Sequence, residues 1–178
     1  MKFTKMQGLG NDYVYVDCFK ETVENPEKTA VFVSNRHFGI GSDGLILIKP
    51  SKVADCQMDM YNLDGSRGAM CGNGIRCVGK YAYDHGIVPA DRKVLTVETA
   101  SGIKTLTVKE KNGKAVQLTV DMGRPEQTSE IPDSIEVDGK EYQFIGISMG
   151  NPHAVLFVDD TAAVPLESIG PKFECHRR

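Results

Sequence analysis

The segment 71–77 reads CGNGIRC and has the residue types for proton chemistry. It places Cys71 directly before an expected helix, where unpaired backbone N–H groups and partial positive charge bind carboxylates and favour thiolate over thiol. Gly72 and Gly74 carry no side chain that could keep a ligand from the backbone. The pattern predicts Cys71 as an acid/base group beside an anion site, with Cys77 packed inside the helix.

An ordinary buried cysteine is the alternative interpretation of Cys71, since free cysteine is among the most buried residue types. The two glycines weigh against it, because the start of a plain core helix gains nothing from residues that cost chain entropy. We therefore expect a functional thiol at this position.

The helix that follows Cys71 is predicted from its two ends and its apolar spacing. Asn73 or a neighbour is expected to cap it, and Ile75, Val78 and Ala82 recur at helical spacing. Gly86 is expected to follow the last turn as the residue that ends the helix.

Strand patterns outnumber helical ones in the rest of the chain. A second helix is expected from a cap and a first-position proline at Asn25-Pro26 to about Arg36. Asn112-Gly113 and Asp138-Gly139 predict tight hairpin turns. Strands are expected at residues 3–6, 12–17, 45–48, 55–62, 94–99, 103–109 and 115–120.

Composition sets the broad class of protein. With 178 residues, of which 40% are hydrophobic, the chain has material for one domain or two small ones. The net charge is −3 and the basic residues are dispersed, so no nucleic-acid partner is expected. No apolar signal or membrane-spanning stretch is present, which predicts a cytoplasmic protein without a membrane partner. Five cysteines at irregular spacings predict reduced thiols and no metal.

A connector at residues 122–134, which contains two prolines, predicts a domain boundary near its start. We expect a first domain at 1–121 and the start of a second at 122–178. Residues 10–17 are echoed by 150–159: in both, Gly-Asn leads into an apolar strand pattern that ends in aspartate. Chance similarity between strand residues is the alternative, because valine and aromatics are common in all strands.

The repeat hypothesis makes a further claim about the second half. Cys71 lies 60 residues after Asn11, so a full copy would place a second cysteine motif at about residue 211. We therefore expect that this sequence is cut within its second half, or has lost it.

Two repeats that each offer a thiol to one cleft could invert a stereocentre without a cofactor. One thiolate removes an α-proton, and the opposite thiol delivers a proton to the other face.

Five segments together resemble the diaminopimelate epimerases, isomerases of lysine and peptidoglycan precursor synthesis that work without pyridoxal phosphate. The resemblance covers essentially the whole chain. The segments are residues 6–12, 35–44, 62–66, 71–77 and 150–153.

The resemblance implies an α+β fold of two pseudo-symmetric domains, each with a curved, mostly antiparallel sheet around a central helix, the second domain being incomplete here. It implies interconversion of LL- and meso-diaminopimelate by two thiols, with diaminopimelate as the small-molecule substrate and no cofactor. A homodimer is the assembly that it suggests. Activity of the 178-residue chain alone is left open.

Site residues are carried over position by position. The resemblance implies that Cys71 is the first catalytic thiol and that His153 lies near the thiols, where it could orient or activate one. A histidine that opens a strand is otherwise more often merely hydrogen-bonded or exposed. Cys175 is rejected as the second thiol, because it has no glycine neighbour and comes too early in the chain.

Substrate-binding residues follow in the same way. Gly72 and Asn73 are implied as donors around the substrate carboxylate. Asn11, Asn62 and Asn151 are implied as amides that suit a zwitterion, since each can donate and accept. The alternative is that asparagine beside glycine shapes turns.

Departures from the family pattern leave alternatives open. The family often has glutamine where this chain has Gly44, so that substrate contact is lost or comes from elsewhere. The family's later asparagine, glutamate-arginine pair and second cysteine motif are not in this sequence. One alternative is a non-catalytic half that binds an amino acid. Another is a different two-thiol enzyme, such as a proline racemase-like or phenazine-type isomerase.

Overall fold

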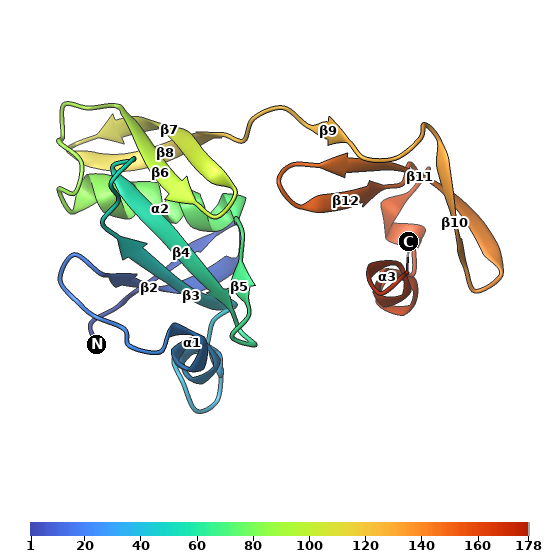
Figure 1. Cartoon of the computed structure of the whole chain (residues 1–178), viewed down its shortest axis with the longest axis horizontal. Helices are drawn as coiled ribbons and strands as arrows, with labels where there is room; N and C mark the ends of the chain where they lie inside the picture. The colour runs from blue at the N-terminus through green and yellow to red at the C-terminus, as the bar shows by residue number, and fades with distance from the viewer. Residues whose placement is uncertain (178) are drawn as a thin grey trace. The chain divides into compact units, whose positions relative to one another are not determined.

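The chain divides into two compact units, Met1–Met122 and Gly123–Arg178, and the computed structural model describes residues 1–177 (Figure 1). That these units are a complete and a partial epimerase domain stays a prediction. Among residues 1–177, no helix combines the length and apolarity that crossing a membrane requires.

The first unit contains one curved sheet and two helices. The helices are α1 (Pro26–Ser34) and α2 (Gly72–Asp84). The strands are β1 (Thr4–Gly8), β2 (Asn11–Asp17), β3 (Gly44–Lys49), β4 (Cys56–Asn62), β5 (Arg67–Gly68), β6 (Val94–Thr99), β7 (Gly102–Lys111) and β8 (Lys114–Asp121).

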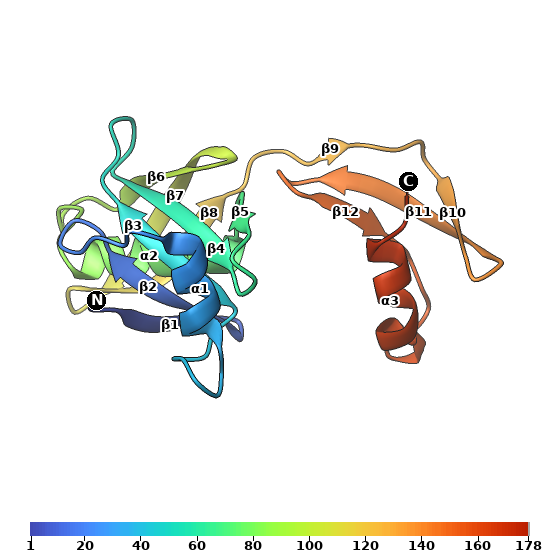
Figure 2. The same cartoon turned by 60° about the horizontal axis from the view of Figure 1, so that its bottom comes forward.

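The sheet of the first unit is mostly antiparallel and curls around α2. Its strand order is β1-β2-β3-β4-β6-β7-β8, with β5 paired to β4. Only the β2–β3 and β4–β6 pairs are parallel within the described residues. Helix α2 contacts β1 and β8, which lie at opposite ends of this order, as Figures 1 and 2 show. The predicted α+β class, with a curved and mostly antiparallel sheet around a helix, is confirmed.

Alternating side chains of β2 and β3 build two cores, one on each face of the sheet. Tyr15 and Ile46 pack on the α2 side, whereas Val14 and Leu45 pack on the α1 side. All four are at most 1% exposed. Burial on both faces explains why these strands read as nearly continuous apolar runs.

The sequence predicted the strands of the first unit closely. All seven expected strands form, with ends that move by at most two residues. Asn25 caps α1 by accepting a hydrogen bond from Lys28 N at 3.2 Å. The helix ends at Ser34, two residues before the expected Arg36. Asn112 and Gly113 both have positive φ, at 55° and 75°, which confirms the predicted tight turn.

The second unit is a smaller antiparallel sheet with helical segments after it. Its central strand, β11, pairs with β10, β12 and β9. The α3 helix was not predicted. The elements are β9 (Glu126–Gln127), β10 (Asp133–Val137), β11 (Lys140–Ser148), β12 (Pro152–Val155), η1 (Thr161–Ala163) and α3 (Leu166–Glu174).

The expected strand after Gly150 is shorter than the repeat hypothesis implied. β12 ends at Val155 and not at Asp159, because its pairing with β11 covers only Pro152 to Val155. Gly10 and Gly150 do share a feature: both have positive φ, 84° and 94°, directly before Asn and the strand. The predicted turn at 138–139 is confirmed by positive φ at both residues.

Candidate functional site

Several strand ends of the first unit meet the N-terminus of α2. The β1–β2 turn is formed by Leu9 and Gly10, both with positive φ. It lies against the first turn of α2, because a Cβ atom on Gly8 would stand 3.0 Å from the carbonyl oxygen of Asn73. A side chain at Gly8 would therefore push the hairpin away from the helix start.

Cys71 is itself the N-cap of α2. Its backbone is extended, with φ −137° and ψ 113°, and its Sγ accepts a hydrogen bond from Gly74 N at 3.3 Å. Asn73, the first residue proposed as cap, instead accepts a hydrogen bond from Arg76. The reason is positional, because a side chain at the N-cap reaches the N–H of the third helical residue, whereas Asn73 already lies inside the helix.

The structure brings Asn11 and Cys71 into contact across 60 residues of sequence. The Cys71 thiol donates to Asn11 Oδ1 at 3.2 Å. The other end of the same amide, Nδ2, donates to Asp43 Oδ2 at 2.8 Å. Two residues that the sequence assigned to the site therefore share one hydrogen-bonded chain, which ends on a carboxylate.

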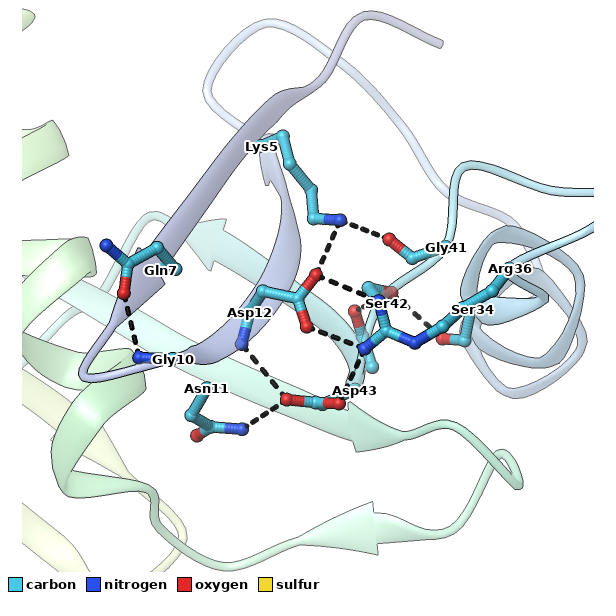
Figure 3. Close-up of polar contacts among 11 residues, drawn as sticks. Lys5, Gln7, Gly10, Asn11, Asp12, Ser34, Arg36, Gly41, Ser42 and Asp43 are labelled. Carbon is cyan, nitrogen blue, oxygen red and sulfur yellow. Dashed lines mark hydrogen bonds and ion pairs between the residues drawn. The ribbon is translucent and has the colours of Figure 1, made fainter.

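A network of charged groups surrounds that carboxylate (Figure 3). Arg36 Nη2 donates to Asp43 Oδ1 at 2.9 Å and to Asp12 Oδ1 at 2.8 Å. Lys5 Nζ lies 2.7 Å from Asp12 Oδ2 and also donates to the carbonyl of Gly41. The two carboxylates are thus held together by two cations, and the β2 start is tied to the loop before β3.

The Arg36 guanidinium, by hydrogen bonding to Asp12, holds the pKa of that carboxyl well below its usual range. Lys5 acts in the same direction, and burial opposes both. A depressed folded-state pKa stabilises the fold fully above the unfolded value near 4, and this stabilisation is lost as pH falls toward the folded value.

We expect Asp12→Asn to flatten the acid side of the stability profile. In the unchanged protein the free energy of unfolding should fall as pH is lowered from about 5 to 2, since the Asp12 carboxyl takes up a proton in the unfolded chain while it stays ionised in the fold. The variant has no carboxyl to titrate there, so its slope should be smaller. Urea unfolding at a series of pH values measures this, and parallel profiles for the two proteins would contradict it.

Aromatic side chains of β2 form the buried side of Cys71. Tyr13 is 5% exposed, and burial, with Cys71 adding to it, raises the pKa of its phenol well above the usual range. Tyr15 OH donates to the carbonyl of Gly74 at 3.5 Å. Both phenols therefore stay neutral. The thiol faces two uncharged aromatic side chains on this side.

Asn62 lies at the same edge of the sheet, at the end of β4. It is paired with Gly44 in the β3–β4 ladder, next to Asp43. Its Nδ2 donates to Ser66 Oγ at 2.9 Å, and its backbone N–H donates to the Ser66 carbonyl at 2.8 Å. In this state the side chain closes a turn, so its proposed role toward a ligand stays a prediction.

Asn151 and His153 belong to the second unit. His153 Nε2 and Asn151 Oδ1 lie 3.2 Å apart, and both residues are exposed. The two side chains are therefore adjacent in the second unit. Their roles at Cys71 stay predictions. Cys175 is exposed and follows α3 as its C-cap.

Gly44 is surrounded so closely that its lack of a side chain has a structural reason. A Cβ atom there would lie 2.2 Å from the carbonyl oxygen of Tyr61 and 2.9 Å from Tyr13 Cε1. The backbone path seen here therefore excludes the glutamine that the family often has at this position. The polar residues beside it are Ser42, whose Oγ donates to the Gly44 carbonyl at 2.9 Å, its chain neighbour Asp43, and its ladder partner Asn62.

Sequence reasoning missed the charged residues of the network. Asp12, Arg36 and Asp43 lie in the segments 6–12 and 35–44 that carry the resemblance, but no role at the site was predicted for them. The available signal was that Asp12 lies at the start of β2 and Asp43 directly precedes β3. In a parallel pairing of those strands they become neighbours, and Asp12 and Asp43 are indeed joined by an Asp43 N to Asp12 O hydrogen bond of 2.7 Å.

Comparison with known proteins shows a match over most of the chain. The sequence model described as Diaminopimelate epimerase matches residues 3–128. A diaminopimelate epimerase of Acetivibrio thermocellus is 54% identical over 187 residues, which cover 99% of this chain and 66% of that protein. One from Methanococcus maripaludis is 50% identical, covering 100% and 68%. The chain thus spans about two thirds of the length of these relatives.

Solved structures of more distant proteins share the fold. A hydroxyproline epimerase from Agrobacterium vitis superposes with a TM-score of 0.66 at 16% identity, covering 91% of this chain and 53% of that one. A PhzF-family phenazine biosynthesis protein from Bacillus anthracis gives 0.59 at 18% identity, covering 86% and 53%. At this identity the likeness concerns the fold alone.

Proposed function

Because the chain belongs to the diaminopimelate epimerase family, we propose that it interconverts LL- and meso-diaminopimelate by proton transfer at one α-carbon. The observation that carries this proposal is the placement of Cys71: a thiol at a helix N-terminus, hydrogen-bonded to Gly74 N and to an oriented amide. The reaction would serve lysine and peptidoglycan precursor synthesis in the cytoplasm, without pyridoxal phosphate.

The proposed step moves one proton at a time. The thiolate of Cys71 takes the α-proton from one face, and a second acid delivers a proton to the opposite face, so the stereocentre inverts. In the reverse direction Cys71 is the donor. The second acid is not assigned to a residue of this chain. The developing carbanion charge needs aimed amide dipoles, which the first turn of α2 supplies.

Substrate recognition is proposed to use the polar groups around Cys71. The backbone of Gly72 and the side chain of Asn73 would bind the α-carboxylate, since N–H groups at a helix start suit an anion. Asn11 and Asn62 would bind the ammonium and carboxylate pair, because an amide offers both a donor and an acceptor.

The second unit and the assembly complete the proposal. Asn151 would bind the same zwitterion, and His153 would orient or activate a catalytic thiol. The protein is proposed to act as a homodimer on this small-molecule substrate.

Inversion in heavy water tests the proposed function. The native protein, purified from its source cell, is incubated with LL-diaminopimelate in ²H₂O. The stereoisomers are then separated, and the mass of each is measured by mass spectrometry. We expect meso product with one deuterium on the inverted α-carbon, because the delivering acid carries a solvent deuteron. Binding without exchange would favour the non-catalytic half. Racemisation of proline in place of diaminopimelate would favour another two-thiol enzyme.

A further inference from the structure

The side-chain amide of Asn11 stands between the thiol of Cys71 and the carboxylate of Asp43. An amide has a donor end and an acceptor end, and the two ends act oppositely on a thiol. An oxygen can accept from S–H and so supports the protonated thiol. An N–H would donate to sulfur and so support the thiolate.

Asp43 decides which end faces the thiol. An ionised carboxylate only accepts, and its Oδ2 takes hydrogen bonds from Asn11 Nδ2 at 2.8 Å and from Asp12 N at 3.0 Å. Its Oδ1 is held by Arg36 Nη2 at 2.9 Å. With its donor end bound in this way, Asn11 must turn Oδ1 toward Cys71 Sγ, as Figure 3 shows for the Asp43 side.

The contacts of Asn11 and Gly74 with the Cys71 sulfur have opposite effects, and the Tyr13 phenol lies beside the same thiol. Asn11 Oδ1, at 3.2 Å, supports the thiol, whereas Gly74 N–H, at 3.3 Å, supports the thiolate. Other titratable groups that face the sulfur are Tyr13 and Tyr15 from β2 and Cys77 from α2. The charge of Asp43 lies behind the amide.

We propose that Asp43 is a positioning residue that sets the orientation of the Asn11 amide and thereby keeps Cys71 protonated in the resting protein. This rests on the proposed function, in which Cys71 is an acid/base. The resting protein then already carries the proton that Cys71 delivers to the α-carbon in one direction of the reaction. In the other direction Cys71 must first lose that proton to solvent, which breaks its hydrogen bond to Asn11 Oδ1.

A double-mutant cycle on the thiolate fraction tests the proposal. Alkylation of Cys71 by iodoacetamide is followed by peptide mass from pH 5 to 10, and each rate is normalised to its high-pH plateau so that changes in access cancel. Asp43→Ala frees the amide to turn, so the normalised rate at pH 7 should rise about tenfold. In an Asn11→Ala background there is no amide to turn, and the same change should add less than about twofold.

The control is Asp55→Ala, because the Asp55 carboxylate, like that of Asp43, accepts hydrogen bonds from a backbone N–H, a polar side chain and an arginine. It accepts from a backbone N–H at Thr96, from the Thr96 hydroxyl and from Arg92, but it is not bonded to Cys71 or Asn11. Its normalised alkylation profile should match that of the unchanged protein. A shift as large as that of Asp43→Ala would mean that general loosening explains the effect.

Outcomes of the cycle separate orientation from charge. Equal effects of Asp43→Ala in both backgrounds would overturn the proposal, because only the lost charge would then act. If Asp43→Ala does not fold, Asn11→Asp gives the second test: its carboxylate accepts from S–H, so alkylation at pH 7 should slow. A rate equal to or above that of the unchanged protein would overturn the proposal. The readout needs no turnover, so it stands apart from the test of epimerisation.

Discussion

Replacing Cys71 by serine is expected to lower kcat for diaminopimelate epimerisation by about 10³-fold or more while the fold stays intact. Proton transfer by a positioned side chain contributes about 10²- to 10⁴-fold, and a serine hydroxyl is far too weak an acid to replace a thiol. Serine is also a preferred N-cap. Because Cys71 caps α2 through Gly74 N, the serine variant keeps the structural bond and removes only the proton chemistry.

Cys71→Ala separates the two roles further. Alanine cannot cap, so this variant should lose activity and also about 1 kcal/mol of unfolding free energy. Both variants are made in the full-length native protein. Stereoisomer separation measures their epimerisation rate, and urea unfolding measures their free energy of unfolding. Epimerisation that persists in the serine variant within about tenfold would remove Cys71 from the proton-transfer step.

Ile46→Ala is expected to lower the free energy of unfolding by about 2–5 kcal/mol, the range for large-to-small changes in a core. Ile46 is fully buried in β3, in the cluster that β2, β3 and α2 share. Its Cδ1 lies 2.7 Å from where a Cβ of Gly74 would be, so it fills the space beneath the first turn of α2. The cavity should also loosen the turn that carries Cys71, and activity should fall with stability.

Ile103→Ala is the matched control for that change. Ile103 is also an isoleucine in a strand of the same sheet, but it is 50% exposed. Its loss should cost within about 0.5 kcal/mol, as is usual for surface positions. Denaturant unfolding of both variants measures the difference. Equal losses would mean that the cluster beneath α2 is not the core that seats the site.

Local sequence chemistry determined most of the first unit. The short apolar runs of β2 and β3, the Asn-Gly turn at 112–113 and the proline after Asn25 act over a few residues, so their outcome could be predicted without neighbours. The segment around Cys71 belongs to this class, because a cysteine before glycines and an apolar helical pattern predicts a thiol at a helix start. The strand expected at 150–159 was predicted too long, and helix α3 was not predicted. Pairing and packing within the second unit set the lengths of these elements.

Tertiary structure alone decided which residues of the site are hydrogen-bonded to one another. The sequence named Asn11 and Cys71, but their contact depends on the β1–β2 hairpin resting on the first turn of α2. Asp43 reaches Asn11 only because β2 and β3 pair in parallel, which no local pattern specifies. A residue type states what a side chain can donate or accept. The orientation of an amide between a thiol and a carboxylate depends on partners that the fold brings from 32 and 60 residues away.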